Sequence, residues 1–270
     1  MSHQVIVAFL LTLFAGISTG VGSAIAFFAK RTNTSFLAVS LGFSAGVMIY
    51  VSFVELFTTS IDTLVGIHGK ADGTLYSTLA FFGGIALILI IDKLIPQYEN
   101  PHEMHRVEDM SDGRRKKALK PKLLRVGMVT ALVLAIHNFP EGMVTFLAAL
   151  KDVNIAIPIA IAIAIHNIPE GISVSVPIYY ATGNRKRAFW LSFLSGLAEP
   201  VGAVIGYLVL APFLDDNVFG IIFGMIAGIM VFISLDELLP AAEEYGKHHH
   251  AIYGLVAGMA VMAISLLMLG

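Results

Sequence analysis

The hexapeptide His-Asn-x-Pro-Glu-Gly occurs twice in this chain, at His137–Gly142 and at His166–Gly171. Both copies lie inside long apolar runs. A charged side chain at the centre of a bilayer costs roughly 2.5–3.5 kcal/mol on insertion scales, so such residues usually have a function. Imidazole, amide and carboxylate groups are also metal ligands. The duplicated motif therefore predicts a metal site in the middle of a membrane protein.

Helical spacing brings the polar groups of each copy to one side of a helix. The histidine and the glutamate are four residues apart and share a face, and the asparagine lies about 100° around the axis. Two such helices facing each other would bring both sets to one point, where a glutamate from each could bridge two ions. The candidate ligands are His137, Asn138, Glu141, His166, Asn167 and Glu170.

Glu199 is a further candidate, because it lies about halfway along another apolar run, as the two motifs do. Three carboxylates at one depth would repel one another, and a divalent cation would relieve that repulsion. The chain has no cysteine, so a thiolate site is excluded. The nitrogen and oxygen donors suit Zn(II), Fe(II), Co(II) or Mn(II) better than Ca(II).

The elements that would position these groups are membrane helices. The chain is 57% hydrophobic and 13% charged, whereas soluble domains carry roughly 25% charged residues. Eight apolar runs are long enough to cross about 30 Å of hydrocarbon. The predicted fold is an all-α integral membrane protein with spans at Val5–Ala29, Phe36–Phe57, Leu75–Ile95, Leu123–Leu150, Val153–Tyr179, Phe189–Leu210, Val218–Leu239 and Ala251–Leu269.

The basic residues predict the orientation of these spans. Of the 17 lysines and arginines, all but Lys70 and Lys151 fall on one side. That side is predicted to be cytoplasmic, with both termini extracytoplasmic. The whole chain, 1–270, is expected to form one transmembrane domain, with residues 96–122 as a flexible cytoplasmic loop.

Two groups of histidines lie outside the apolar runs. For His102 and His105, in the polar loop, a solvated surface is favoured over weak metal binding. His248–His250 precede the last span. They could collect metal or simply begin a helix, and the sequence leaves both interpretations open.

A second repeat links the second and seventh spans. Seven residues recur at a constant offset of 182: Gly42, Ala45, Gly46, Met48, Ser52, Glu55 and Leu56 match Gly224, Ala227, Gly228, Met230, Ser234, Glu237 and Leu238. Because the two spans are antiparallel, this pattern favours a 3+2+3 inverted repeat with its binding site at the repeat interface. Close helix packing would explain the small residues but not the glutamates.

The carboxylates of this repeat are candidate waypoints for an ion. Asp236 and Glu237 are expected near the cytoplasmic end of the seventh span as an exit, with Glu55 as the external counterpart. Ordinary helix-end carboxylates remain an equal alternative.

The two motifs resemble the fourth- and fifth-helix signatures of the ZIP (Zrt/Irt-like) metal transporters, in particular their bacterial ZupT-type branch. The resemblance covers the whole chain and implies a binuclear centre. One site would comprise Glu141, His166 and Glu170, with His137 near it. The second would comprise Asn138, Glu141, Asn167, Glu170 and Glu199, with two glutamates bridging.

The resemblance also implies a function and an assembly. It implies uptake of divalent ions into the cytoplasm, sliding of the central helices against the outer ones, and a homodimer in the bacterial inner membrane. Many eukaryotic members carry other residues where this chain has Asn167 and Glu170, so broad selectivity is expected. Zn²⁺, Fe²⁺, Mn²⁺, Co²⁺ and Cd²⁺ would be transported substrates, with no prosthetic group and no nucleic-acid partner.

Two other functions remain as alternatives. A metal exporter could use the same site. An intramembrane metallohydrolase is less favoured, because it calls for a His-Glu-x-x-His motif on a helix, and His102-Glu103-Met104-His105 has the wrong spacing. The sequence also has no phosphate-binding loop of the Walker type.

Overall fold

The computed structural model describes residues 3–28, 34–94, 113–245 and 248–269, and within these ranges the chain is helical and contains no strand. The elements are α1 (His3–Phe28), α2 (Thr34–Val51), the π-helix η1 (Ser52–Phe57), α3 (Thr58–His68), α4 (Lys70–Leu94), α5 (Gly113–Lys151), α6 (Val153–Thr182), α7 (Arg185–Gly196), α8 (Ala198–Leu210), the short 3₁₀-helix η3 (Ala211–Phe213), α9 (Asp216–Ile233), the π-helix η4 (Ser234–Leu238), α10 (Leu239–Tyr245) and α11 (His248–Leu269).

Seven stretches of the described chain are long and apolar enough to cross a membrane. They coincide with seven of the eight predicted spans. The remaining prediction, Leu123–Leu150, lies inside α5 and is not among the seven. The all-helical prediction is confirmed, whereas the count of eight spans stays a prediction.

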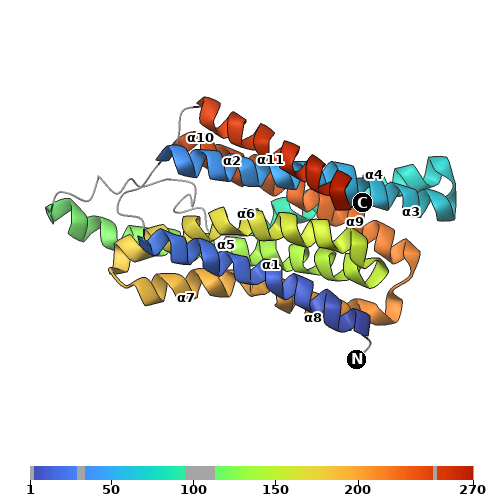
Figure 1. The fold of residues 1–270 in the computed structure, drawn as a ribbon, viewed down its shortest axis with the longest axis horizontal. Coiled ribbons are helices and arrows are strands. Elements are labelled where there is room, and N and C mark those ends of the chain that lie inside the picture. Colours follow the sequence, from blue (N-terminus) through green and yellow to red (C-terminus); the bar gives the residue numbers. More distant parts are fainter. Residues whose placement is uncertain (1–2, 29–33, 95–112, 246–247, 270) are drawn as a thin grey trace.

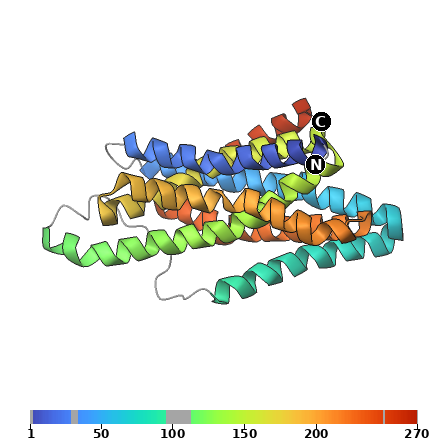
Figure 2. The same cartoon turned by 90° about the horizontal axis from the view of Figure 1, so that it is seen from below.

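The helices pack as two bundles that lie side by side, with their axes roughly along the long dimension of the molecule (Figures 1 and 2). One bundle contains α1, α5, α6, α7 and α8, and the other contains α2, α3, α4, α9, α10 and α11. Contacts between the bundles are fewer and run mainly through α2 and α6. Between α5 on one side and α4 and α9 on the other lies an apolar cavity of about 460 Å³.

Polar residues at the connections explain where several helices begin and end. Asp152, Asn184 and Asp215 precede α6, α7 and α9, and each side chain accepts a hydrogen bond from a backbone N–H of the first turn. Gly69 and Gly183 have φ values of 80° and 68°. This left-handed region favours glycine and allows the tight turns that follow α3 and α6.

The second span is longer than predicted. Helical structure continues from α2 through η1 and α3 to His68, so the predicted end of the second span at Phe57 was wrong. The helix α3 is amphipathic. Ser60 and Leu64 are buried, and the Ser60 hydroxyl donates to the Gly220 carbonyl at 2.6 Å.

Two further boundaries differ from the prediction. Residues 113–122, expected in a flexible loop, are the first turns of α5, where Lys, Arg, Ala and Leu are good helix formers. The rest of that loop, 96–112, lies outside the described residues. The sixth span is divided at Leu197 into α7 and α8, because Pro200 lacks the N–H that would bond to the Gly196 carbonyl.

Close glycine contacts recur in pairs across the molecule. A β-carbon on Gly46 would meet the Leu255 carbonyl of α11, and one on Gly228 would meet the Phe81 carbonyl of α4. The glycines are 182 positions apart, as in the sequence repeat, and their partners are 174 apart. The π-helices η1 and η4 also begin 182 positions apart, at Ser52 and Ser234.

The second set of paired contacts surrounds the motifs. A β-carbon on Gly142 of α5 would meet the Glu199 carbonyl of α8, and one on Gly171 of α6 would meet the Thr19 carbonyl of α1. Corresponding positions in α1 and α7–α8 are thus 180 residues apart. Gly16 and Gly196, also 180 apart, contact each other's carbonyl oxygens.

Candidate metal centre

The two motifs lie on α5 and α6, neighbouring helices joined at Asp152. Their polar side chains are almost completely inaccessible: His137 is 2% exposed, and Asn138, Glu141, His166, Asn167 and Glu170 are at most 1% exposed. Glu199, on α8, is 0% exposed. The structure therefore encloses all seven predicted ligands within the protein.

Glu141 and His166 join the two motifs directly. His166 Nε2 lies 3.3 Å from one carboxylate oxygen of Glu141 and 3.4 Å from the other. The opposite ring nitrogen, Nδ1, lies 3.2 Å from the Ala162 carbonyl, which can only accept a hydrogen bond. That contact places a proton on Nδ1. Nε2, which faces the carboxylate, is then the nitrogen that can bind a metal once it carries no proton.

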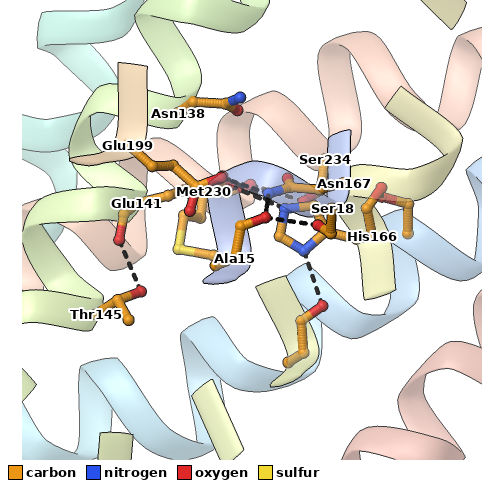
Figure 3. Close-up of polar contacts among 12 residues, drawn as sticks. Ala15, Ser18, Asn138, Glu141, Thr145, His166, Asn167, Glu199, Met230 and Ser234 are labelled. Carbon is orange, nitrogen blue, oxygen red and sulfur yellow. Dashed lines mark hydrogen bonds and ion pairs between the residues drawn. The ribbon is translucent and has the colours of Figure 1, made fainter. Parts of the chain in front are cut away.

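The two asparagines occupy equivalent positions. Asn167 Nδ2 donates to the Ala15 carbonyl of α1 at 2.9 Å and contacts the Glu199 carboxylate. Asn138 Nδ2 donates to the Ser195 carbonyl of α7 at 3.1 Å. Ala15 and Ser195 are again 180 positions apart. Each asparagine is thus anchored by its amide group, and Figure 3 shows the contact between Asn167 and Glu199, with Glu141 nearby.

His137 reaches the other bundle. Its Nε2 lies 3.0 Å from Glu237 Oε1, and the two side chains are 3% and 14% exposed. Glu237 belongs to η4, a π-helix that widens the helix by one residue, as π-bulges often do at functional sites. Glu237 was expected as an exit waypoint near a helix end, and that role stays a prediction; in the structure its carboxylate lies beside His137 of the first motif.

Glu170 lies close enough to other charged groups of the site to interact with them electrostatically. Its carboxylate interacts electrostatically with His166, Glu141 and His137. All the motif carboxylates and histidines therefore lie within one electrostatic environment.

Several buried polar atoms of this cluster have no hydrogen-bond partner among the described residues: His137 Nδ1, Asn138 Oδ1, Asn167 Oδ1, Glu170 Oε2 and Glu199 Oε2. Buried polar atoms are nearly always paired, so an unpaired group of ligand atoms calls for an explanation. Buried oxygen and nitrogen ligand atoms without partners fit a cationic substrate. In the described part of the chain, however, no three His, Asp or Glu side chains are already close enough to hold a metal ion.

The remaining candidates that the structure describes lie on elements other than α5, α6 and α8. Glu55 is half-buried in η1, and Asp236 is exposed in η4. His102 and His105 are outside the described residues. The His248–His250 run begins α11, where the His249 ring stacks on Tyr253 with centroids 6.0 Å apart.

Sequence reasoning missed the contribution of α1, whose Ala15 carbonyl anchors Asn167. A signal was available in the glycines at positions 16 and 22 of α1, which recur at 196 and 202. The offset of 182 relates only the second and seventh spans, whereas these glycines recur at an offset of 180.

Comparison with known proteins identifies the family. Residues 92–266 match the family model described as ZIP zinc transporter. Three relatives, each named zinc transporter ZupT, align along nearly their whole length. The protein of Streptococcus mutans is 61% identical over 99% of this chain and 99% of its own. That of Lysinibacillus sphaericus is 60% identical over 100% of both. That of Clostridium perfringens is 59% identical over 98% of this chain and 97% of its own.

All three relatives are named as transporters rather than as enzymes, so the metallohydrolase alternative is not supported. The family match covers most of the chain, and the relatives cover almost all of it. The chain belongs to the ZIP zinc transporter family.

Proposed function

We propose that this integral membrane protein transports divalent cations, zinc foremost, across the bacterial inner membrane into the cytoplasm. The single observation that carries the proposal is the cluster of seven buried ligand side chains on α5, α6 and α8, several with unpaired donor atoms. Family membership and three relatives named zinc transporter agree with it.

We assign the metal-binding role to His137, Asn138, Glu141, His166, Asn167, Glu170 and Glu199. An arriving zinc ion loses water and gains imidazole and carboxylate ligands in exchange, beginning with the facing pair Glu141 and His166. Carboxylates from both helices neutralise the charge of the ion, which the hydrocarbon would otherwise exclude. Glu237 keeps His137 in place from the opposite bundle.

The proposed architecture has eight spans in a 3+2+3 inverted repeat, with both termini outside. The paired contacts at offsets of 180 and 182 support it, because each relates a helix of the first three to one of the last three. The apolar run inside α5 supplies the eighth span. Movement of the two bundles along their sparse interface would expose the site to each side in turn.

The proposed substrates include Fe²⁺, Mn²⁺, Co²⁺ and Cd²⁺ besides Zn²⁺, since the mixed nitrogen and oxygen donors suit borderline metals. The proposed assembly is a homodimer in the lipid bilayer. Export through the same site is the competing function.

Zinc flux into proteoliposomes tests the proposal. Wild-type protein should carry zinc down an imposed gradient, and Glu141→Ala and Glu170→Ala should each reduce the rate at least tenfold, because each removes a charged ligand. Normal rates in both variants would overturn the site assignment. In cells, growth under zinc limitation should require the protein if it works as an importer, whereas resistance to excess zinc would instead indicate export.

A further inference from the structure

We infer that Thr19 of α1 is an additional substrate-binding residue, and that with Asn138 it forms a neutral oxygen pair facing the transported divalent cation. The inference rests on the proposed function and deepens it. Nothing in the motif analysis points to Thr19. It emerges from the paired contacts around the motifs and from the state of its hydroxyl group.

Thr19 is the positional counterpart of Glu199. Thr19 contacts Gly171 of the second motif through its carbonyl oxygen, just as Glu199 contacts Gly142 of the first. The two residues are 180 positions apart, the same separation as between the asparagine anchors Ala15 and Ser195. The Glu199 carboxylate of α8 contacts Asn167 of the second motif. By the same repeat, the hydroxyl of Thr19 on α1 would be directed toward the first motif.

The Thr19 and Asn138 side chains both reach α7. A β-carbon built on Gly196 would be 2.6 Å from Thr19 Oγ1, so the hydroxyl rests on this residue of α7. The adjacent residue, Ser195, holds the amide nitrogen of Asn138 through its carbonyl. The two side chains therefore contact two consecutive residues of α7, Ser195 and Gly196.

The oxygen atoms of both side chains are unsatisfied. Thr19 and Asn138 are 0% exposed, and neither Thr19 Oγ1 nor Asn138 Oδ1 has a hydrogen-bond partner among the residues described. Threonine hydroxyls buried in helices usually bond to a carbonyl four residues back, as Thr12 does to Ala8 at 3.0 Å. For Thr19 that carbonyl belongs to Ala15, which already accepts from Asn167 Nδ2 and from the Ser18 hydroxyl, so the Thr19 hydroxyl is left for a ligand.

The chemistry of the pair suggests its role. Hydroxyl and amide oxygens bind hard and borderline cations, directly or through a water that the ion retains, but more weakly than carboxylates. The first half of the site would therefore hold the cation loosely, opposite the Asn167–Glu199 half that holds it by charge. This asymmetry leaves the centre with one carboxylate fewer than full symmetry would give, which favours release.

Three substitutions test the inference in proteoliposomes with zinc as the probe. Thr19→Val keeps the shape and removes the hydroxyl, and it should raise KM for zinc about three- to tenfold with little change in kcat, as expected for one lost polar contact. Thr19→Ser should restore the wild-type KM. Thr19→Asp makes the two halves alike, and it should lower KM and kcat together because tighter binding slows release.

Thr12→Val is the matched control, since Thr12 is an equally buried threonine on the same helix whose hydroxyl is satisfied within the helix. It should leave KM unchanged. Removing the unpaired Thr19 hydroxyl should not lower the melting temperature of the purified protein, because no internal bond is lost. A change in KM without a change in melting temperature therefore indicates an effect on binding rather than on stability.

An unchanged KM in Thr19→Val, a KM in Thr19→Ser as high as in Thr19→Val, or an unchanged KM in Thr19→Asp would each overturn the inference. The proposed function has its own test in the same assay. If the wild type transports zinc and Glu141→Ala does not, while Thr19→Val behaves as wild type, the inference alone fails. If wild type and Glu141→Ala are equally inactive, the proposed function fails.

Discussion

At the scale of single residues, the site consists of pairs of polar side chains that contact each other. Glu141 faces His166, Glu237 faces His137, and Asn167 contacts Glu199. Each of these contacts links different helices. The pairs hold the ligands in position inside the protein, and a cation that enters must exchange these contacts for its own.

The His137–Glu237 pair gives the first prediction. Glu237→Gln retains a hydrogen-bonding group but removes the charge, and a hydrogen bond to a charged partner contributes about 1.5–3 kcal/mol. We expect kcat/KM for zinc transport to fall about tenfold. Isotope flux into proteoliposomes measures it.

Asp62→Asn is the control for this prediction, because Asp62 is an exposed carboxylate on α3 in the same bundle. It should transport at the wild-type rate. A wild-type rate in Glu237→Gln would mean that the contact with His137 has no part in transport.

At the scale of elements, glycines set how closely the helices approach. Gly84 of α4 lies against the Met225 carbonyl of α9, whereas its neighbour Gly83 has open space around its Cα. The α4–α9 contact has its counterpart where Gly258 of α11 lies against the Phe43 carbonyl of α2. Such close approach is typical of small residues at helix interfaces in membranes.

Gly84 and its neighbour Gly83 give the second prediction, which compares the effect of alanine at each position on stability. Gly84→Ala should force α4 and α9 apart and destabilise the protein by about 1–3 kcal/mol, as overpacking does. Gly83→Ala should be neutral or stabilising by up to about 1 kcal/mol, because alanine is the better helix former. Thermal unfolding of the purified variants in detergent distinguishes them, and equal melting temperatures would contradict this description of the interface.

The π-helices η1 and η4 are also features at the scale of elements. Each contains one of the glutamates that the sequence repeat singled out, Glu55 and Glu237. Regular α-helical spacing therefore misjudges which way these glutamates point. The sequence predicted the repeat but not the extra residue in each helix, because π-bulges leave no clear signal in hydrophobic periodicity.

At the scale of the whole molecule, two bundles meet across an interface with few polar links. The Ser44 hydroxyl of α2 donates to the His166 carbonyl at 3.4 Å, near the site. At one end, Lys151 Nζ lies 3.7 Å from Asp216 Oδ1 and 4.2 Å from the centroid of Phe219. A sparse interface with an apolar cavity beside α5 allows one bundle to move against the other more easily than a tightly packed core would.

The orientation of the bundles in the membrane gives the third prediction. The turn after α3 and the turn after α5 lie at one end of the molecule, since Lys151 Nζ contacts Thr63 at 3.5 Å, and α7 begins at the other end (Figure 1). Both marked termini lie toward the α3 end. The arginines and lysine that begin α7 should face the cytoplasm.

Single cysteines test this orientation without background, because the chain has none. Gly66→Cys, exposed near the end of α3, should react with a membrane-impermeant maleimide in intact cells. Arg185→Cys, exposed at the start of α7, should react only after the membrane is permeabilised. The reverse pattern would invert the orientation, and labelling of both in intact cells would contradict the proposed topology.

The sequence alone determined the helical class and the chemical types of the candidate ligands, and it placed the motifs midway along apolar runs. These properties depend on composition, on the length of apolar runs and on spacing along one helix, all of which are local. It placed His137 and Glu141 on one face, but could not say which helix lies opposite that face.

The tertiary structure decided the partners. Glu237 reaches His137, Ala15 and Ser195 anchor the asparagines, and Thr19 occupies the position equivalent to Glu199. These contacts join residues far apart in the chain. Helix packing, set by the close approach of backbones at glycines, determines them, and periodicity along a single helix contains no information about it.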